Sequence, residues 1–540
     1  MMRGQDQDRF DVPYIILGAG PAGLQLGYHL QQSGRDYMIL EAGDGPGTFF
    51  ERFPRHRQLI SINKVHTGCS CPEMNLRWDW NSLLTDDYSM NLSSYSKAYF
   101  PAAEVLKSYL ADFAQRFNLN IRCQTRIEGV SKNGKFQLVD QKGHVYTCSR
   151  LIVATGLTQP YIPDIPGIEH GESYVDFSID PQEFVDQRVL IIGKGNSGFE
   201  TAENLIETTA SIQLCSPTPV RLAWKTHYVG HLRAVNNNFL DTYQLKSQNT
   251  VLDAYIEKIE PHDGRYLVHI LYTHAKGERR QILFDRILIC AGFRFDASLF
   301  DETCRPALAC HGKFPELTHE WESVNVSDLY FAGNLMHSRD YRRTMSGFIH
   351  GFRYNVRALS QILQRKYEEH ALPFREISSD PTAMANYVVE RINRSSAMFL
   401  QPAFFCDAIV IEDDGRVLCL EDMPTDYVHA SDLGENAWYY TVSLEYGDFH
   451  TPPDPFNLER DPDPAVAHLT AYLHPILRRY HRGQLVHEHH IPEDLENVYS
   501  ADKYVLPLVG FFERELAAWM ADHQGYLRPP ADPADTHSGV

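Results

Sequence analysis

The chain has 540 residues, a length that predicts about three domains, and its 43% hydrophobic and 22% charged residues exclude a disordered or collagen-like protein. Seventy acidic residues outnumber fifty basic ones, and the formal net charge of −20 disfavours nucleic acid and anionic membrane surfaces as partners. No stretch reaches the roughly 18 apolar residues that span a bilayer.

The N-terminal segment contains a strand–helix–strand pattern with glycines at its first turn. Residues 14–17 and 37–40 predict strands, and residues 24–32 predict the helix between them. The turn glycines, and the acid after the second strand, are Gly18, Gly20, Gly23 and Glu41. Such glycines let the backbone approach a pyrophosphate at a helix N-terminus, and Glu41 can accept from a ribose hydroxyl. The pattern predicts a dinucleotide site.

A second copy of the pattern follows. Residues 188–192 and 211–215 predict strands on either side of a helix that runs to about Thr208. The turn residues predicted to bind the nucleotide are Gly193, Gly195, Asn196, Ser197 and Gly198. The second strand ends at Ser216 without an acid, and Arg221 and Lys225 follow, which favours the 2′-phosphate of NADPH over the free hydroxyl of NADH. The alternative is that both cations are solvated surface charges.

Three further apolar strands end in similar turns, at Gly156, at Gly292 and at Gly333 with Asn334, and a helix is predicted over 347–363. This ordered set resembles the two-dinucleotide-binding-domain flavoproteins, in which FAD occupies the first fingerprint. By that resemblance the last turn holds the flavin ribityl chain, and Asn334 replaces the family's usual Asp without its charge. The expected fold class is α/β, with two Rossmann-like domains for FAD and NADPH and a C-terminal α+β extension.

The resemblance also predicts the domain boundaries. Residues 1–170 and 291–370 would form the FAD-binding domain, residues 171–290 the NADPH-binding domain, and residues 371–540 the C-terminal domain with a disordered tail after Tyr526. In that last domain, the sequence predicts strands at 408–411 and 438–444 and helices at 382–394, 465–480 and 503–520. His487 and His489 could share a strand face as metal ligands, but a plain polar strand is the simpler interpretation, and no metal is expected.

Flavin and NADPH together allow several reactions. Disulfide chemistry of the thioredoxin-reductase type needs a Cys-x-x-Cys pair, and none of the ten cysteines forms one. The closest pair, Cys69 and Cys71, is most simply part of a loop. Sparse cysteines, and a start without a signal-peptide pattern, predict a reducing cytoplasmic location.

Residues 53–66 lie where class B flavin monooxygenases and amino-acid N-hydroxylases carry a helix that faces the flavin. By resemblance to their motifs, Asn63 is the candidate amide beside the flavin and Lys64 the candidate anchor of a substrate carboxylate, and both are candidate catalytic residues. The alternative is that they are loop and cap residues on a solvated helix. Residues 165–174 retain part of the monooxygenase linker fingerprint.

The same segment concentrates positive charge in an acidic chain, at Arg52, Arg55, His56, Arg57, Lys64 and His66. This contrast favours a small anionic substrate, and a dicarboxylic amino acid such as aspartate would use two cationic groups. The candidate substrate-binding residues are Arg57, Lys64 and Asn238. Alternatively, part of the cluster binds cofactor phosphates, and the loop around Asn238 is an ordinary surface loop.

A closer resemblance covers nearly the whole chain. Four segments resemble the FAD-dependent oxidoreductase domain-containing protein 2 family, including its C-terminal extension: residues 55–64, 75–84, 224–246 and 347–354. That family is lumenal and tied to endoplasmic-reticulum-associated degradation. Since this chain shows neither the family's signal peptide nor its retention tail, the lumenal role is not carried over.

These inferences predict an FAD- and NADPH-dependent monooxygenase that N-hydroxylates a small amino acid or amine through a C4a-hydroperoxyflavin. Its partners would be a small-molecule substrate and O2, without nucleic acid or membrane and with a homo-oligomer left open. The alternative is a flavoprotein redox adaptor, or an NADPH oxidase or reductase, that acts with a protein partner.

Overall fold

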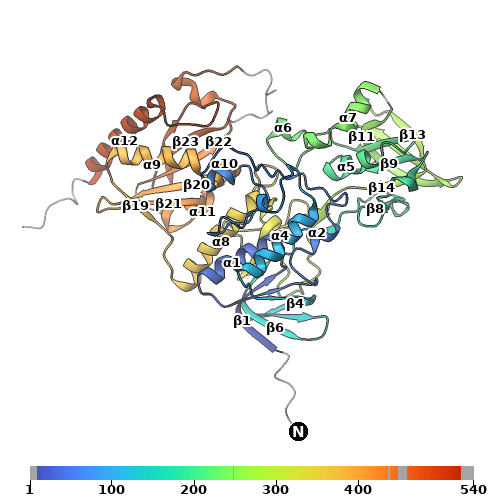
Figure 1. The fold of residues 1–540 in the computed structure, drawn as a ribbon, viewed down its shortest axis with the longest axis horizontal. Coiled ribbons are helices and arrows are strands. Elements are labelled where there is room, and N and C mark those ends of the chain that lie inside the picture. Colours follow the sequence, from blue (N-terminus) through green and yellow to red (C-terminus); the bar gives the residue numbers. More distant parts are fainter. Residues whose placement is uncertain (1–8, 247, 436–437, 448–458, 524–540) are drawn as a thin grey trace, which may run out of the picture. The chain divides into compact units, whose positions relative to one another are not determined.

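The computed structural model describes residues 9–246, 248–435, 438–447 and 459–523 (Figure 1). The chain forms two compact units, one of residues 1–68 and 78–360 and the other of residues 69–77 and 361–540. The tail after Tyr526, predicted to be disordered, lies outside the described residues. Within the described part of the chain, no helix combines the length and the apolar character that crossing a membrane requires.

The first sheet of the first unit surrounds the strand that leads into the first glycine turn. Its strands are β1 (Arg9–Leu17), β2 (Tyr37–Leu40), β3 (Ile121–Arg122), β4 (Ile127–Asn133), β5 (Lys135–Asp140), β6 (Val145–Val153) and β18 (Leu329–Phe331). The order is β3-β2-β1-β6-β5-β4, with β18 also beside β6. β1, β2, β3, β6 and β18 run parallel, whereas β4 and β5 form an antiparallel hairpin at one edge.

The second sheet repeats this plan around the second fingerprint. Its strands are β8 (Glu172–Ser173), β9 (Arg188–Ile192), β10 (Ser211–Ser216), β11 (Thr250–His262), β12 (Arg265–Tyr272), β13 (Arg279–Phe284) and β14 (Arg286–Ile289). In the order β13-β12-β11-β10-β9-β14-β8, the strands from β11 to β8 pair in parallel and β12 and β13 add an antiparallel extension. β9 is almost wholly buried, as expected of a strand covered on both faces.

Helices follow the strands in the manner that both patterns predict. The main helices that begin in this unit are α1 (Pro21–Gln32), α4 (Ala103–Arg116), α5 (Asn196–Leu205) and α8 (Ile349–Glu368). Short elements complete it: α2 (Phe49–Arg52), α6 (Ala223–Thr226), α7 (Asn238–Asp241), the strand pairs β7 (Gln159–Pro160) with β15 (Phe293–Arg294) and β16 (Leu308–Ala309) with β17 (Phe314–Pro315), and the 3₁₀ segment η6 (Gly333–Arg339).

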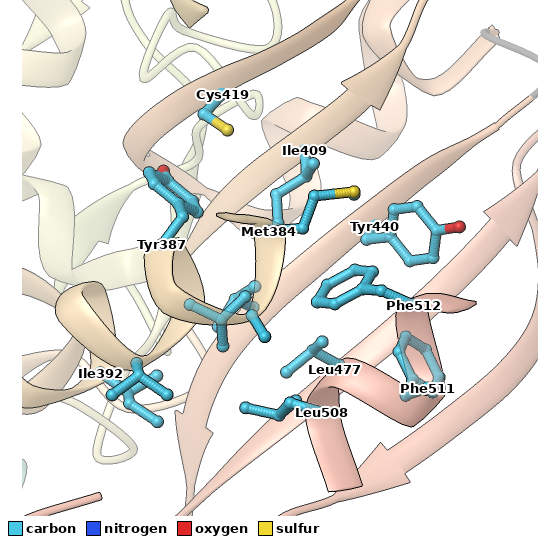
Figure 2. Packing of buried hydrophobic residues seen from close by; sticks show 14 of the residues in the cluster. Met384, Tyr387, Ile392, Ile409, Cys419, Tyr440, Leu477, Leu508, Phe511 and Phe512 are labelled. Carbon is cyan, nitrogen blue, oxygen red and sulfur yellow. The ribbon is translucent and has the colours of Figure 1, made fainter. Parts of the chain in front are cut away.

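The second unit is an α+β fold around one antiparallel sheet (Figure 1, orange to red). Its strands, in sheet order, are β19 (Arg375–Ile377), β21 (Val417–Pro424), β20 (Phe405–Ile411), β22 (Tyr439–Glu445), β23 (His474–His481) and β24 (Gln484–His490). Helices α9 (Pro381–Arg394) and α12 (Asp502–His523) share one hydrophobic core with this sheet. In Figure 2, the Phe512 ring lies beside the Tyr440 ring in that core. The two Rossmann-like sheets and this α+β unit confirm the predicted fold class.

One predicted helix of this unit is wrong. Residues 465–480 form a 3₁₀ turn at Pro464–Leu469 followed by β23, which pairs with β22 on one side and β24 on the other. Pro475 weakens the helix, because proline removes a backbone hydrogen bond and clashes with the preceding turn, and the pairing of β23 on both sides stabilises the strand instead.

The second unit also includes residues 69–77, which no sequence motif indicated. Helix α3 (Pro72–Asn75) lies in this segment, and the Glu73 carboxylate accepts from the backbone N–H of Ser396 at 2.8 Å. The Arg77 guanidinium donates to the carbonyl oxygens of Ile392 at 3.2 Å and Ser395 at 3.1 Å. These bonds fasten the segment to α9 and to the start of α10 (Ser396–Leu400).

Removing the Phe512 ring should destabilise the second unit. Its side chain is fully buried and packs at 5.8 Å between ring centroids against Tyr440. Phe512→Ala should lower the free energy of unfolding by about 3–5 kcal/mol, measured by urea denaturation followed by circular dichroism. Met520→Ala, at a position of α12 that is 53% exposed, is the matched control and should change it by less than about 0.5 kcal/mol. Equal effects of the two substitutions would contradict this description of the core.

Candidate active site

The first glycine turn brings strand, helix and backbone into close contact. Gly18 has φ +101°, and a Cβ there would lie 2.9 Å from the carbonyl oxygen of Ala154. A Cβ on Gly23 would lie 1.9 Å from the Gly18 carbonyl oxygen. A Cβ on Gly20, by contrast, would meet no atom within 4 Å, and Gly20 lines a large cavity at the start of α1. The turn therefore leaves room for a phosphate at the helix N-terminus.

The second turn repeats this geometry at the end of β9. A Cβ on Gly198 would lie 2.6 Å from the Gly193 carbonyl oxygen, and one on Gly193 would lie 2.3 Å from the carbonyl oxygen of Cys290. Gly195, at the start of α5, again would meet no atom within 4 Å and lines the same cavity.

One cavity of about 1230 Å³ connects the two turns. This volume exceeds the roughly 300–1,000 Å³ typical of a site for one small ligand. Eleven residues predicted to bind cofactor line it: Gly20, Gly156, Gly193, Gly195, Asn196, Ser197, Ser216, Arg221, Gly292, Gly333 and Asn334. Gly18, Gly23 and Gly198 are not in the lining; they allow the close backbone contacts that form the two turns.

Glu41 holds the first turn through its carboxylate. One oxygen accepts from the backbone N–H of Ala19 and the other from that of Gly43, both at 2.7 Å. Glu41 itself does not line the cavity, so in this structure it orders the turn that faces the cavity.

Asn334 has an amide oxygen available to a ligand. Its Nδ2 donates to the carbonyl oxygen of Gly347 at 2.9 Å, whereas its buried Oδ1 has no hydrogen-bond partner among the described residues. A buried acceptor without a donor is costly, and a hydroxyl of a flavin side chain would satisfy it. A Cβ on Gly333 would lie 2.6 Å from the Cβ of Ala22, which fixes the start of η6 against α1. These features fit FAD at the first turn.

Asn196 fastens the second turn to the loop that follows α6. Its Oδ1 accepts from the backbone N–H of Arg233 and from Asn236 Nδ2, both at 3.0 Å, and its Nδ2 donates to the carbonyl oxygen of His231 at 2.9 Å. Of the two cations that follow Ser216 in the sequence, Arg221 lines the cavity and Lys225 does not.

Glu200 is a cavity residue that the sequence analysis did not select. It lies on α5 one turn after Asn196 and Ser197, and that spacing could have predicted a shared face. Burial raises the pKa of Glu200 to about 7; the side chain of Asn236 opposes this shift and nearby Glu203 adds to it. The carboxyl therefore exchanges a proton near neutral pH.

All four segments that carry the closer family resemblance contribute residues to the cavity lining. Arg233 donates to the carbonyl oxygen of Ile60 at 2.8 Å and lies 5.0 Å above the ring centroid of Trp80. His350 stacks on the Trp80 ring, with the two ring centroids 4.3 Å apart. Burial lowers the pKa of His350 well below its usual value, and neither of its ring nitrogens has a hydrogen-bond partner among the described residues. His350 is thus a neutral imidazole in the cavity wall.

The structure does not bring Asn63 or Lys64 into the cavity. Asn63 is buried, and its Nδ2 donates to the carbonyl oxygens of Ser96 at 2.9 Å and Ala98 at 3.1 Å. Lys64 is exposed. The physical reason is that residues 53–66 form no helix, so alternate side chains point in different directions. Ile60 and Ser61, which shortly precede Asn63 in the sequence, do line the cavity.

The other predicted substrate residues also lie outside the lining. Arg57 forms an ion pair with Glu104 at 2.7 Å, and Asn238 donates to Glu203 at 3.5 Å from the start of α7. Arg55 donates to the carbonyl oxygens of Tyr174 and Phe177. The positive segment is therefore engaged largely with protein groups.

Comparisons with known proteins agree with this geometry. A family model described as pyridine nucleotide-disulphide oxidoreductase matches residues 15–333. FAD-dependent oxidoreductase domain-containing protein 2 of Mus musculus is 37% identical over 559 aligned residues, which cover 93% of this chain and 83% of the mouse protein. Two solved structures are similar over 66% of this chain and 99% of their own, a flavin-containing monooxygenase from Stenotrophomonas maltophilia (20% identity, TM-score 0.52) and a bacillithiol disulfide reductase from Staphylococcus aureus (19%, 0.51).

The chain belongs to the pyridine nucleotide-disulphide oxidoreductase family and, within it, to the family of FAD-dependent oxidoreductase domain-containing protein 2. It is an FAD-dependent oxidoreductase with a second nucleotide-binding fold, which binds NADP(H). The solved structures share this fold and differ in their chemistry, so the choice of reaction depends on the cavity itself.

A side chain at Gly20 should exclude FAD without unfolding the protein. Gly20→Val would place a branched side chain in the space in front of the α1 N-terminus, and the purified protein should lose most of its bound FAD, measured by its visible absorbance. Gly129→Ala in β4, where a Cβ likewise meets no atom within 4 Å, is the control and should stay yellow. A Gly20→Val protein with full FAD content would contradict this assignment.

The raised pKa of Glu200 should make stability fall as the pH rises. In the folded state the Glu200 carboxyl keeps its proton up to about pH 7, whereas in the unfolded state it releases the proton near pH 4.5. The free energy of unfolding that this difference contributes is fully present below pH 4.5 and is lost as the pH rises through 7. Glu200→Gln removes the titration, so its free energy of unfolding relative to the parent should rise by about 2 kcal/mol between pH 5 and pH 8.

Urea denaturation at the two pH values measures this difference. The exposed Glu207→Gln is the control, and its difference from the parent should stay constant with pH. A constant difference for Glu200→Gln as well would mean that Glu200 is solvated.

Proposed function

We propose that this protein is an NADPH-dependent flavin monooxygenase that N-hydroxylates a small amino acid or amine. The observation that carries the proposal is the single cavity that reaches both nucleotide turns and has protein groups available to a third molecule, among them His350 and Glu200. Bound FAD supplies the two-electron chemistry that activates O2. The overall reaction consumes one amine, one O2, one NADPH and one proton, and yields the hydroxylamine, water and NADP⁺.

The cysteines of the cavity support oxygenation over disulfide reduction. Cys215 and Cys290 line it, and burial raises the pKa of each thiol to about 12. Thiol–disulfide exchange needs a thiolate, which neither side chain provides near neutral pH. Cys69 and Cys71 belong to the second unit and are not in the lining.

The protein groups around the cavity can orient a bound substrate. Trp80 and Arg233 form a packed wall, and His350 offers neutral nitrogens that can orient a substrate by hydrogen bonds. The Glu200 carboxyl can hold a proton at one oxygen and release it near pH 7, in the range where general acids and bases work.

A redox adaptor or NADPH oxidase that acts with a protein partner is the second candidate. The observation that favours it is the second unit, an α+β fold around its own six-stranded sheet that adds a separate body to the nucleotide-binding unit. Such a protein would consume NADPH slowly without its partner and would form no oxygenated product.

One assay separates these functions. FAD-loaded protein receives NADPH in air with aspartate, phenylalanine or butylamine, and in parallel with cystine or glutathione disulfide. Monooxygenase activity predicts that one amine shifts the product from hydrogen peroxide to a hydroxylamine detected by mass spectrometry, with about one NADPH per product. Acceleration by a disulfide, or peroxide alone with every amine, would contradict N-hydroxylation.

We further propose that NADPH is preferred over NADH through Arg221. The loss of a charge-assisted hydrogen bond to phosphate costs about 1.5–3 kcal/mol, so Arg221→Ala should weaken NADPH binding about ten-fold or more and leave NADH unchanged. Lys225→Ala is the matched control because Lys225 lies four residues away and outside the lining. Titration of the FAD-loaded protein with both nucleotides measures the change, and an equal loss for NADPH and NADH would show that Arg221 does not contact the phosphate.

A further inference from the structure

We propose that Lys313 and Arg342, together with a wall of aromatic rings, form a subsite of the cavity that binds the carboxylate of a small aromatic acid. The inference rests on the proposed function in one respect, namely that the bound acid is an amino acid whose amine is to be oxygenated. It moves the substrate-binding cations from residues 52–66, where the sequence suggested them, to a different part of the unit.

The two cations come from different segments and face the same ring. Lys313 immediately precedes β17, and its Nζ lies 5.5 Å from the ring centroids of both Phe314 and Tyr341. Arg342 follows η6, and its guanidinium carbon lies 5.0 Å from the Tyr341 centroid. Both residues line the cavity.

Neither cation is neutralised by an acid. No carboxylate of the described residues forms an ion pair with Lys313 or Arg342, whereas Lys194, elsewhere in the lining, is paired with Asp253. Burial, reinforced by Arg342, lowers the pKa of Lys313. A carboxylate placed between the two would relieve both the burial of the ammonium and the repulsion between the cations.

Asp340, a buried acid two residues before Arg342 in the chain, is not in the lining. Its Oδ2 accepts from the Thr344 hydroxyl and from the Ser346 backbone N–H, and burial raises the pKa of Asp340 to about 6. The described lining contains Asp164 and Glu200 as its acids, so cations outnumber acids around the cavity. This balance favours an anionic ligand within a chain of net charge −20.

The wall beside the cations is aromatic. Phe314 and Tyr341 lie 5.4 Å apart between ring centroids, and His337 lies 5.5 Å from Tyr341. Tyr228, from the loop after α6, lies 5.6 Å from His337 and 6.0 Å from Phe348. All of these side chains line the cavity. Edge and face contacts of this kind favour a flat aromatic body, and the adjacent cations favour a carboxylate attached to it.

A phosphate of NADPH is the other anion that could reach this position. Burial lowers the pKa of His231 to about 4, and Arg221 and Arg342 lower it further, so both guanidiniums lie near that imidazole. The test therefore uses separate probes for the aromatic carboxylate and for the nucleotide phosphate.

The experiment measures binding to FAD-loaded protein by isothermal titration, without turnover. Phenylacetate is the probe, and 2-phenylethanol and acetate are its neutral and ring-free controls. Phenylacetate should bind at least about ten-fold tighter than either control. Lys313→Met and Arg342→Met should each weaken phenylacetate about ten-fold and leave 2-phenylethanol unchanged, whereas Lys313→Arg should stay within a few-fold of the parent. FAD content and circular dichroism confirm that each variant is folded.

Adenosine 2′,5′-bisphosphate is the probe for the phosphate. Arg221→Ala should weaken it and leave phenylacetate unchanged, and Lys313→Met should do the reverse. The proposal is overturned if the parent binds no phenylacetate, if both methionine variants bind it as the parent does, or if Lys313→Met and Arg342→Met weaken only the bisphosphate.

This outcome is independent of the proposed function. Phenylacetate binding that depends on both cations, combined with no oxygenation of any amine or acid, would support the subsite and refute the monooxygenase. If an amine is oxygenated but phenylacetate binds equally well to the parent, Lys313→Met and Arg342→Met, the subsite alone is refuted.

Discussion

The close approach of a helix to the strand before it is the constraint on which both nucleotide turns depend. At Gly23 and Gly198 an added Cβ would lie 1.9 Å and 2.6 Å from the carbonyl oxygen of the first glycine of the same turn. Any side chain there would push the helix away from the strand and move its N-terminus. Because the same contact occurs twice, Gly20 and Gly195 both come to line one cavity, in front of α1 and α5 respectively.

Between the two turns, the cavity wall depends on residues far apart in the sequence. Arg233 links the second fingerprint's loop to Ile60 by a hydrogen bond and to Trp80 by its position over the ring, and His350 stacks on the same tryptophan. Between Ile60 and Trp80 the chain contributes residues 69–77 to the second unit, through Glu73 and Arg77. Two residues of the wall, Ile60 and Trp80, are therefore separated in the sequence by a segment that belongs to the second unit.

The sequence predicted the fold class and the two turns well because each is a local pattern. Glycine spacing, strand length and helix length determine such a turn within about 30 residues, and tertiary context changes little. Helix 465–480 was wrong because Pro475 disfavours a helix and pairing on both sides stabilises a strand. Asn63 and Lys64 were placed by resemblance to a helical motif, whereas this segment is extended and turns Asn63 toward Ser96 and Ala98.

Residues assembled from separate segments could not be found in this way. Lys313 comes from the hairpin of β16 and β17 and Arg342 from a loop after η6, and neither belongs to a recognisable motif. Tyr228 lies in the family-like segment 224–246, but that resemblance gave it no role. Glu200 could have been predicted as a cavity residue, because it follows Asn196 by four residues in a predicted helix. Its raised pKa, in contrast, comes from burial that only the folded chain provides.

If one cavity brings NADPH to the FAD of the same chain, NADPH alone should reduce that FAD. The most direct test adds NADPH to the FAD-loaded protein without oxygen, substrate or partner protein and follows the visible absorbance of the bound FAD. We predict that this absorbance is lost on mixing and returns when O2 is admitted. Absorbance that persists with NADPH, and disappears only with dithionite, would contradict the account.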